Sequence, residues 1–225
     1  MDNDVLRHAP LFSALDDEAA TALRASMADT RLRRGEVLFH EGDEGDKLYI
    51  VTDGKVKLGR TSSDGRENLL AILGPGQMFG ELSLFDPGPR SATVTAVTDT
   101  TFAALSHEDL LRWLDGRPEV ARGLLAQIAS RLRKANDVNA DLVFSDVPGR
   151  VAKALLDLAD RFGRTADDGV HVHHDLTQEE LAQLVGASRE TVNKALSDFV
   201  SRGWILLEGR TVTLLDVDRL ERRAR

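Results

Sequence analysis

Length, composition and charge limit what this chain can be. Its 225 residues, 42% of them hydrophobic, suffice for one large core or two modest ones, and we expect two domains. The absence of cysteine excludes a disulfide framework, a thiolate metal site and a cysteine-ligated iron–sulfur cluster. A net charge of −8 argues against indiscriminate nucleic-acid binding but leaves room for a local basic patch.

The N-terminal sequence also bears on location. MDNDVLRHAP has no basic region followed by an apolar run, which a secretory signal would need. No stretch of the chain approaches the roughly 18 apolar residues of a membrane span. We therefore expect a cytoplasmic protein that does not contact a membrane.

The first half of the chain predicts a short helix followed by a small antiparallel barrel or roll. The helix covers residues 14–27, with Asp16 and Asp17 near its start, where the helix dipole favours acids. From Gly35 to about Leu105, short β-rich runs alternate with glycine turns, a spacing typical of such a barrel. The runs are residues 37–39, 48–51, 56–58, 68–73 and 92–97, and the turns are 42–45, 53–54, 64–65 and 74–76.

The most informative segment is FGELSLFDPGPRSA, residues 79–92. Residues 80–83 can start a short helix whose free N–H groups would face an anion. Glu81 can accept hydrogen bonds from sugar hydroxyls, and Arg90 offers a planar fork that suits a phosphate diester. Ser91 adds a hydroxyl donor. The segment therefore predicts a site for one anion and one diol.

Two alternatives to this site stay open. The stiff turn at 86–89 could hold Glu81 and Arg90 apart around a ligand, or the loop could simply be closed by a surface ion pair between them. Glu81 could also serve an enzyme as an acid–base pair with His40. No second carboxylate, metal cluster or activated nucleophile accompanies them in the sequence, so we expect no catalytic residue.

Past Pro118 the pattern becomes helical. A 3–4 alternation runs for about three heptads and predicts one long helix. The seam residues are Ala121, Leu125, Ile128, Leu132, Ala135, Asn139 and Leu142. The unbroken seam favours a coiled-coil dimer, in which Asn139 could fix the register, over a helix laid against its own domain.

A hinge and a second domain are predicted next. Residues 146–149, DVPG, read as a hinge because Pro and Gly together break a helix. Residues 151–162 have helical spacing, and 169–174 alternate as a strand does. This strand carries His171, His173 and His174. They lack a partner at metal-ligand spacing, so we expect exposed histidines and no metal site.

The next segment predicts a helix-turn-helix. Thr177 and Glu180 form a capping box for a helix through Leu184, and the Gly186-Ala187 turn follows. Ser188 then caps a second helix over residues 189–200. A hairpin predicted over residues 204–215, with its turn at 208–210, adds a wing.

In such a motif the start of the second helix enters the DNA major groove. Arg189 can donate two hydrogen bonds to guanine, and Glu190 can accept a hydrogen bond from cytosine N4. Lys194 reaches either a base or a phosphate. The alternative, that these are ordinary solvated residues, is disfavoured by the wing.

In this combination the whole chain resembles the cAMP receptor protein (catabolite activator) family, or CRP/FNR superfamily, of bacterial transcription regulators. The resemblance lies in GELSLF with RSA, in DVPGRVA, and in TQEELAQLVGASRETVNKAL. It implies an α+β fold with a cyclic-nucleotide-binding β-roll domain at 1–117, a dimerisation helix and hinge at 118–145, and a winged helix-turn-helix DNA-binding domain at 146–225. It also implies a regulator rather than an enzyme, with cAMP as allosteric ligand and no metal.

The resemblance implies site residues and partners as well. Gly80, Glu81 and Leu82 would face the ribose, and Arg90 and Ser91 the cyclic phosphate. The full nucleotide set is Gly80, Glu81, Leu82, Ser83, Arg90, Ser91, Leu58, Leu70, Ala71, Arg131 and Asn136. The DNA set is Thr177, Gln178, Ser188, Arg189, Glu190, Thr191 and Lys194. A homodimer would bind a two-fold symmetric, double-stranded DNA operator with TGTGA-like half-sites, and RNA polymerase would be a further partner.

One departure from the family pattern affects ligand selectivity. Where the family commonly has a Thr followed by Ser or Asn against the adenine amino group, this chain has Ala135 and Asn136. The lost hydroxyl removes a hydrogen bond of about 0.5–1.5 kcal/mol. A family member that does not need cAMP, or that answers to another small effector, therefore stays an alternative.

Overall fold

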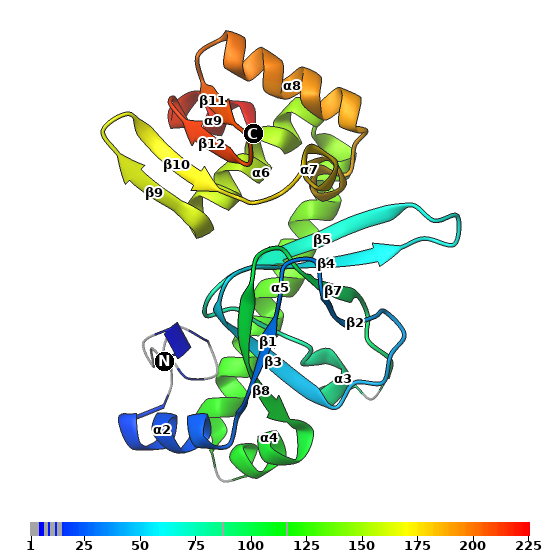
Figure 1. The fold of residues 1–225 in the computed structure, drawn as a ribbon, viewed down its shortest axis with the longest axis vertical. Coiled ribbons are helices and arrows are strands. Elements are labelled where there is room, and N and C mark those ends of the chain that lie inside the picture. The colour runs from blue at the N-terminus through cyan, green and yellow to red at the C-terminus, as the bar shows by residue number, and fades with distance from the viewer. Residues whose placement is uncertain (1–4, 7–8, 10–11, 13–14, 87, 116) are drawn as a thin grey trace. The chain divides into compact units, whose positions relative to one another are not determined.

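Short antiparallel strands build the N-terminal part of the chain (Figure 1). The computed structural model describes residues 5–6, 9, 12, 15–86, 88–115 and 117–225. These form two compact units, one of residues 1–60 with 70–134 and one of 61–69 with 135–225. The long helix α5 (Pro118–Phe144) contributes residues to both units.

Two four-stranded sheets make up the roll. One has the order β1-β8-β3-β6 and the other β2-β7-β4-β5. The strands are β1 (Ala28–Leu32), β2 (Val37–Phe39), β3 (Lys47–Asp53), β4 (Val56–Thr61), β5 (Glu67–Leu73), β6 (Met78–Phe79), β7 (Thr93–Ala96) and β8 (Thr100–Ser106). The predicted roll is therefore confirmed.

Alternating side chains explain why these strands close over a core. In β3, Leu48 and Ile50 are buried in one apolar cluster, whereas Val51 belongs to a second cluster with Phe79 and Phe102. Aromatic rings dominate this second cluster, and Tyr49 stacks on Phe79 with ring centroids 5.4 Å apart. Phe79, the first residue of the segment 79–92, belongs to this aromatic cluster.

Several N-terminal elements differ from the sequence prediction. The first helix, α2, spans Asp17–Ala25 and is shorter than predicted. It begins after Asp16, whose carboxylate caps it by accepting a hydrogen bond from the Ala19 amide. Strands β1, β6 and β8 and the helix α4 (His107–Leu114) were not predicted as separate elements. The short helix α3 (Leu82–Phe85) follows Gly80 as expected. The predicted stiff turn at 86–89 includes residue 87, which lies outside the described residues.

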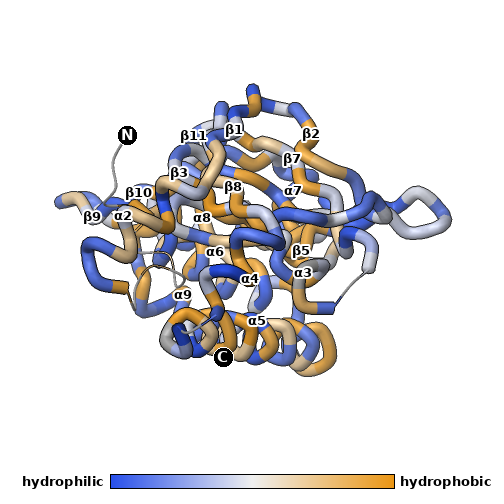
Figure 2. Tube along the Cα trace, turned by 90° about the horizontal axis from the view of Figure 1, so that it is seen from below, coloured by the Kyte–Doolittle hydropathy of each residue, from blue (hydrophilic) through white to orange (hydrophobic). Residues whose placement is uncertain are grey.

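The helix α5 has two different faces. Val120 and Leu124 are fully buried in the first unit. Leu125 and Leu132 on the predicted seam are 65% and 62% exposed in the single chain. Figure 2 shows apolar and polar residues alternating around the turns of α5. The predicted helix is confirmed. On its seam, Leu125, Leu132 and Leu142 are exposed, whereas Ala121 and Ile128 are half-buried.

The second unit combines helices with a four-stranded sheet in the order β11-β12-β10-β9. Its elements are α6 (Val147–Phe162), β9 (Gly163–Ala166), β10 (Gly169–His173), α7 (Gln178–Val185), α8 (Arg189–Ser201), β11 (Ile205–Glu208), β12 (Thr211–Leu214) and α9 (Val217–Arg223). One apolar core joins α6, α7 and α8 to the sheet and includes Leu155, Val192 and Phe199. The predicted helix pair and wing are confirmed.

The hinge prediction needs a correction. Helix α5 ends at Phe144, and the break falls at Ser145 and Asp146. Pro148 and Gly149 lie inside the first turn of α6, where proline is tolerated because the first helical N–H groups need no partner. Asp146 caps this helix by accepting from the Gly149 amide at 2.9 Å.

The histidine prediction is partly wrong. His174 is buried, and its Nδ1 accepts from the Leu176 amide. His171 has a carboxylate neighbour, since Asp168 Oδ1 lies 2.6 Å from its Nε2. Among the described residues no three histidine or acidic side chains come together as a metal-ligand set. In that same part of the chain, no helix combines the length and apolar character of a membrane span.

Two glycine turns give a matched test of the roll. Gly54 and Gly65 both have φ of +81°, but a Cβ at Gly54 would lie 2.3 Å from the Asp99 carbonyl oxygen, whereas one at Gly65 meets nothing within 4 Å. We expect Gly65→Ala to cost about 1–2 kcal/mol from the left-handed backbone alone. Gly54→Ala should cost about 3 kcal/mol, because the clash adds to that strain.

Urea unfolding followed by Trp113 fluorescence, in a Trp204→Phe background, measures both variants. Trp113 packs against the core of the first unit and therefore reports on the roll. Equal destabilisation by the two substitutions would contradict the close approach of Gly54 to Asp99.

Candidate functional site

Arg90 occupies a buried compartment beneath the GELSLF segment. Its side chain is only 4% exposed. Nη1 donates to the Gly80 carbonyl at 2.8 Å and to Ser83 Oγ at 3.3 Å, and Nη2 donates to the Lys47 carbonyl at 2.9 Å. The guanidinium therefore links the turn before α3 to the start of β3.

Two glycines leave room for this guanidinium. A Cβ at Gly80 would lie 2.9 Å from Arg90 Nη1, and one at Gly45 would lie 2.9 Å from Arg90 Cζ. Gly80 also has φ of +83°, which disfavours any other residue. A side chain at either position would displace Arg90.

The electrostatic setting of Arg90 is mixed. Burial lowers its pKa, while Tyr49, Asp46 and Glu81 oppose this shift. The group remains a cation at neutral pH, because arginine keeps its proton in proteins. Burial raises the pKa of the neighbouring Tyr49 hydroxyl, so this group stays neutral. The compartment thus holds a permanent, poorly hydrated positive charge.

Glu81 is fully buried, and its cation comes from a distant part of the chain. Arg131 of α5 donates through Nη1 to Glu81 Oε1 at 2.5 Å, and its own side chain is 35% exposed. A buried carboxylate needs such a partner, since desolvation otherwise makes its charged form costly. The ion pair ties α5 to the segment that carries Arg90.

Each of the two buried charged side chains, Glu81 and Arg90, has one polar atom without a hydrogen-bond partner among the described residues. Within the described residues, Glu81 Oε2 and Arg90 Nε are buried and make no hydrogen bond. Native structures rarely leave buried polar atoms in this state, and such atoms point to a missing ligand or water. A ligand suited to both would bring an acceptor to Arg90 and a donor to Glu81.

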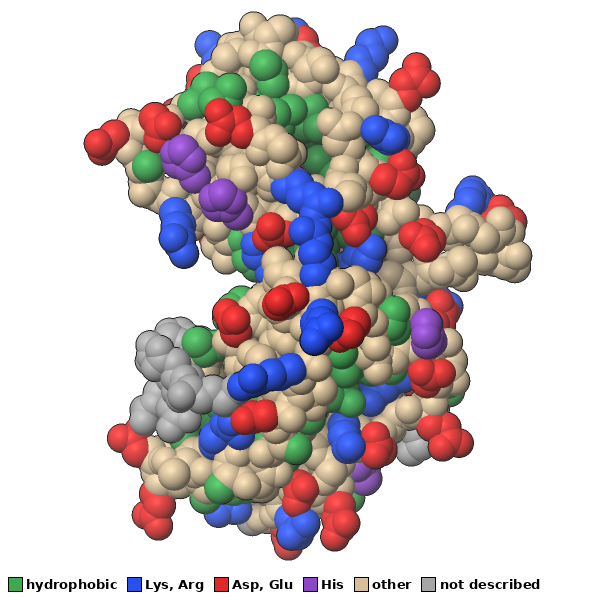
Figure 3. Space-filling view, viewed as in Figure 1, with side chains coloured by type: hydrophobic (Ala, Val, Ile, Leu, Met, Phe, Trp, Pro, Cys, Tyr) green, Lys and Arg blue, Asp and Glu red, His purple; other side chains and the backbone are tan. Residues whose placement is uncertain are grey.

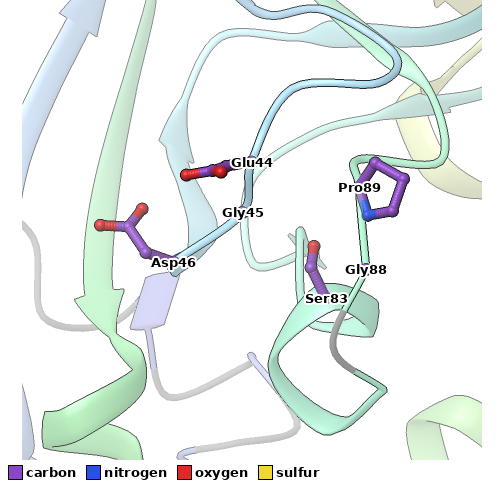
Figure 4. A pocket seen from close by; sticks show the side chains of 6 residues that line it. All are labelled: Glu44, Gly45, Asp46, Ser83, Gly88 and Pro89. Atoms are coloured by element: carbon purple, nitrogen blue, oxygen red, sulfur yellow. The ribbon is translucent and has the colours of Figure 1, made fainter.

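A hollow borders the same segment (Figure 4). It is lined by Glu44, Gly45 and Asp46 from the loop before β3 and by Ser83, Gly88 and Pro89 from the GELSLF segment and its following turn. In Figure 4 the Ser83 hydroxyl points toward the loop that carries Gly45. The two carboxylates make this hollow a poor seat for an anion by itself, so the suitable groups are those on the Arg90 side.

The structure brings together only some of the predicted ligand residues. Gly80, Glu81, Ser83, Arg90 and Arg131 form one connected group. Leu58 on β4 and Ala71 on β5 are half-buried in the second sheet, and Leu70 is 49% exposed. Leu82, Ser91 and Asn136 are exposed. No interaction among the described residues joins these last residues to the charged group.

The second candidate site is the helix pair α7–α8 (Figure 1). Thr177 Oγ1 accepts from the Glu180 amide, and the Glu180 carboxylate accepts from the Thr177 amide, so the capping box is present. Gly186 ends α7 with φ of +68°. Ser188 caps α8 by accepting from the Thr191 amide. These local signals fix where α8 begins.

The predicted DNA-contacting residues lie at the starts of these helices and are solvent-exposed. They are Thr177, Gln178, Ser188, Arg189, Glu190, Thr191 and Lys194. Opposite them on α8, Val192, Ala195, Leu196 and Phe199 are buried. Helix α8 is therefore anchored by one face and presents its polar face to solvent. On the face drawn in Figure 3, basic and acidic side chains are interspersed, so no broad basic surface appears there.

Arg150 is a residue that the sequence interpretation missed. Its guanidinium donates to the carbonyls of Ser145, Val185 and Gly186, at 2.8, 3.0 and 3.3 Å. It thereby joins the chain just after α5 to the turn between α7 and α8. The only signal in the sequence was its place in the DVPGRVA motif, because its partners are backbone atoms that no pattern reveals.

Two domain families of known proteins match this chain. Residues 29–117 match the cyclic nucleotide-binding domain family, and residues 149–223 match the Crp-like helix-turn-helix domain family. A CRP-like cAMP-activated global transcriptional regulator of Mycobacterium tuberculosis is 52% identical over 99% of this chain and 100% of its own length.

Solved structures show the same relationship. FixK2 from Bradyrhizobium japonicum has a TM-score of 0.79 at 26% identity, covering 88% of this chain and 98% of its own. The N-terminal domain of a transcriptional regulator from Streptomyces coelicolor A3(2) is 64% identical, with a TM-score of 0.51, and covers 64% of this chain and 99% of its own. With its nucleotide-binding roll, long helix and helix-turn-helix domain, this chain belongs to the CRP family of transcription regulators, which are not enzymes.

Proposed function

We propose that this chain is a cAMP-responsive, sequence-specific DNA-binding regulator that acts as a homodimer on a palindromic operator. The observation that carries the proposal is the pair of partnerless buried atoms, Arg90 Nε and Glu81 Oε2. A cyclic phosphate supplies the acceptor that Arg90 lacks, and a ribose hydroxyl supplies the donor that Glu81 lacks. Relatives named as a cAMP-activated regulator and as a cyclic AMP receptor protein support cAMP as the ligand.

The base of the ligand is less well specified than its phosphate and ribose. Leu58 and Ala71 offer apolar contact, and Asn136 on α5 offers an amide. Ala135 lacks the hydroxyl that the family pattern places before this residue, which leaves the Asn136 amide as the polar group of this pair for the adenine amino group. This feature supports the second candidate, a family regulator whose DNA binding is weakly coupled to cAMP or that answers to another effector.

We propose α5 as the dimer interface. Leu125, Leu132 and Leu142 are 65%, 62% and 49% exposed in the single chain, and they share the predicted heptad seam. Apolar residues at this spacing are costly to leave in water, and a second copy of the same helix buries them. A dimer with two-fold symmetry would present two copies of α8 to a two-fold symmetric operator.

Helix α5 also offers a route for coupling. In the first unit its Arg131 pairs with Glu81 at the ligand site. In the second unit its Asp141 pairs with Lys153 of α6 at 2.5 Å, and Ser145 accepts from Arg150, which holds the turn before α8. Ligand that changes the Glu81–Arg131 pair would therefore bias the arrangement of the DNA-binding end, as a population shift requires. We propose RNA polymerase as a further partner on the family resemblance alone.

Arg90→Ala tests the ligand site. Loss of a charge-assisted contact to the phosphate should weaken cAMP binding roughly ten- to hundredfold. Titration calorimetry of purified protein measures this, with Arg112→Ala as the control, because Arg112 is an exposed ion-paired arginine on α4. Unchanged affinity in Arg90→Ala would remove Arg90 from the site and with it the main support for the proposed ligand.

Arg189→Ala tests the DNA site. If Arg189 reads a guanine, the substitution should weaken binding to a TGTGA-type palindrome about 5- to 150-fold. It should also abolish the preference for that guanine over adenine, which gel-shift titration with both operators detects. Arg202→Ala is the matched control, since Arg202 lies at the other end of α8 and pairs with Asp198. Full affinity and full base preference in Arg189→Ala would exclude this assignment.

A further inference from the structure

The guanidinium of Arg90 rests on an aromatic ring. Its Cζ lies 4.3 Å from the centroid of the Phe39 ring and 5.8 Å from that of Tyr49, and the two rings are 6.0 Å apart. Both distances are within the range of a cation–π interaction, and Phe39 is much the closer partner. Phe39 belongs to β2, far in the sequence from the segment that carries Arg90.

We propose that Phe39 is a positioning residue for nucleotide binding, which holds the Arg90 guanidinium in the orientation that receives the phosphate. This inference rests on the proposed role of Arg90 as the phosphate ligand. Phe39 acts through Arg90, so it is required for affinity without being assigned any contact with the nucleotide itself.

The hydrogen bonds of Arg90 do not by themselves fix the orientation of its guanidinium. Both terminal nitrogens are committed to Gly80, Ser83 and Lys47, so hydrogen bonds hold the outer edge of the guanidinium. They restrain rotation of its plane about that edge less firmly than a contact on its face does. The ring face restrains this rotation, and Gly45 and Gly80, lacking side chains, supply no competing support. Within the described part of the chain, Nε is then the nitrogen of this guanidinium that makes no hydrogen bond.

The backbone of β2 is shaped to present this ring. The register of β2 against β7 shifts between Val37, opposite Thr95, and Phe39, opposite Val94. Such an irregularity re-aims the side chain that follows it. The ring also belongs to the aromatic cluster, with its centroid 6.2 Å from that of Phe79, so its position is set by packing as well. Because Arg90 is buried, the attraction between cation and ring is weakly screened by water.

The test is cAMP affinity, measured by calorimetry, across a series at position 39. Phe39→Leu and Phe39→Met, which remove the ring, should weaken binding about three- to tenfold. Phe39→Trp should bind within about twofold of the parent, because tryptophan is the strongest cation–π partner. If the Leu variant fails to fold, the cAMP affinities of the Met and Trp variants still compare position 39 with and without an aromatic ring.

Two controls separate positioning from packing. Phe102→Leu removes a fully buried ring of the same cluster that packs edge to face against Phe79 and does not lie against Arg90. It should therefore lower stability but leave cAMP affinity within about twofold. In an Arg90→Gln background, Phe39→Met should cause no further loss, because there is no cation left to position.

The outcomes distinguish this inference from the function on which it rests. If Arg90→Gln loses affinity while the Leu, Met and Trp variants all bind like the parent, Phe39 has no positioning role and the inference is wrong. Equal losses in Phe39→Met and Phe102→Leu would also overturn it, since general packing would then explain both. If Arg90→Gln itself binds cAMP normally, the proposed ligand site fails first.

Discussion

A buried carboxylate needs a cation, and for Glu81 that cation is Arg131 from α5. This single ion pair joins a loop of the roll to a helix that begins 37 residues later in the chain, at Pro118. Without it, the buried Glu81 carboxylate would lose the direct ion pair that offsets its desolvation. With it, the proposed ligand site and the long helix are joined directly, so a ligand that competes for Glu81 would also act on α5.

The rest of the site follows from the same constraint on buried charge. Arg90 is desolvated, and three backbone or hydroxyl oxygens and an aromatic face surround it. Such a site is costly to build, and buried ion pairs add little to net stability. Its remaining unpaired atoms are better explained by ligand binding than by folding. Gly45 and Gly80 have the same explanation, because each leaves space that the guanidinium fills.

Local signals explain why much of the fold was predictable. The capping box at Thr177, the left-handed Gly186 and the Ser188 cap fix the helix-turn-helix to within a residue. The heptad spacing likewise placed α5 correctly. Strands β1 and β6 were not predicted. The polar sequence ADTRL of β1 has no clear alternation, and β6 is only two residues long. The hinge was misplaced because Pro148 was read as a helix breaker, although it sits in the first turn of α6.

The candidate site was predictable only in part, for a related reason. Its charged residues lie within one short segment and belong to a recognisable pattern. Their partners Phe39, Lys47 and Arg131 come from β2, β3 and α5, and only the folded chain brings them together. Arg150 was missed likewise, because it binds backbone carbonyls. His174 reads as an exposed strand residue, but it follows the last residue of β10 and is buried.

The central claim is that nucleotide bound at Glu81 and Arg90 controls the DNA-binding end through α5. The most direct measurement is the affinity of the purified protein for a TGTGA-type palindrome, with and without saturating cAMP, at one fixed salt concentration. The account predicts that cAMP raises this affinity by about 5- to 150-fold, the usual range of coupling between two sites. Equal affinity with and without cAMP, in protein that calorimetry shows to bind the nucleotide, would contradict it.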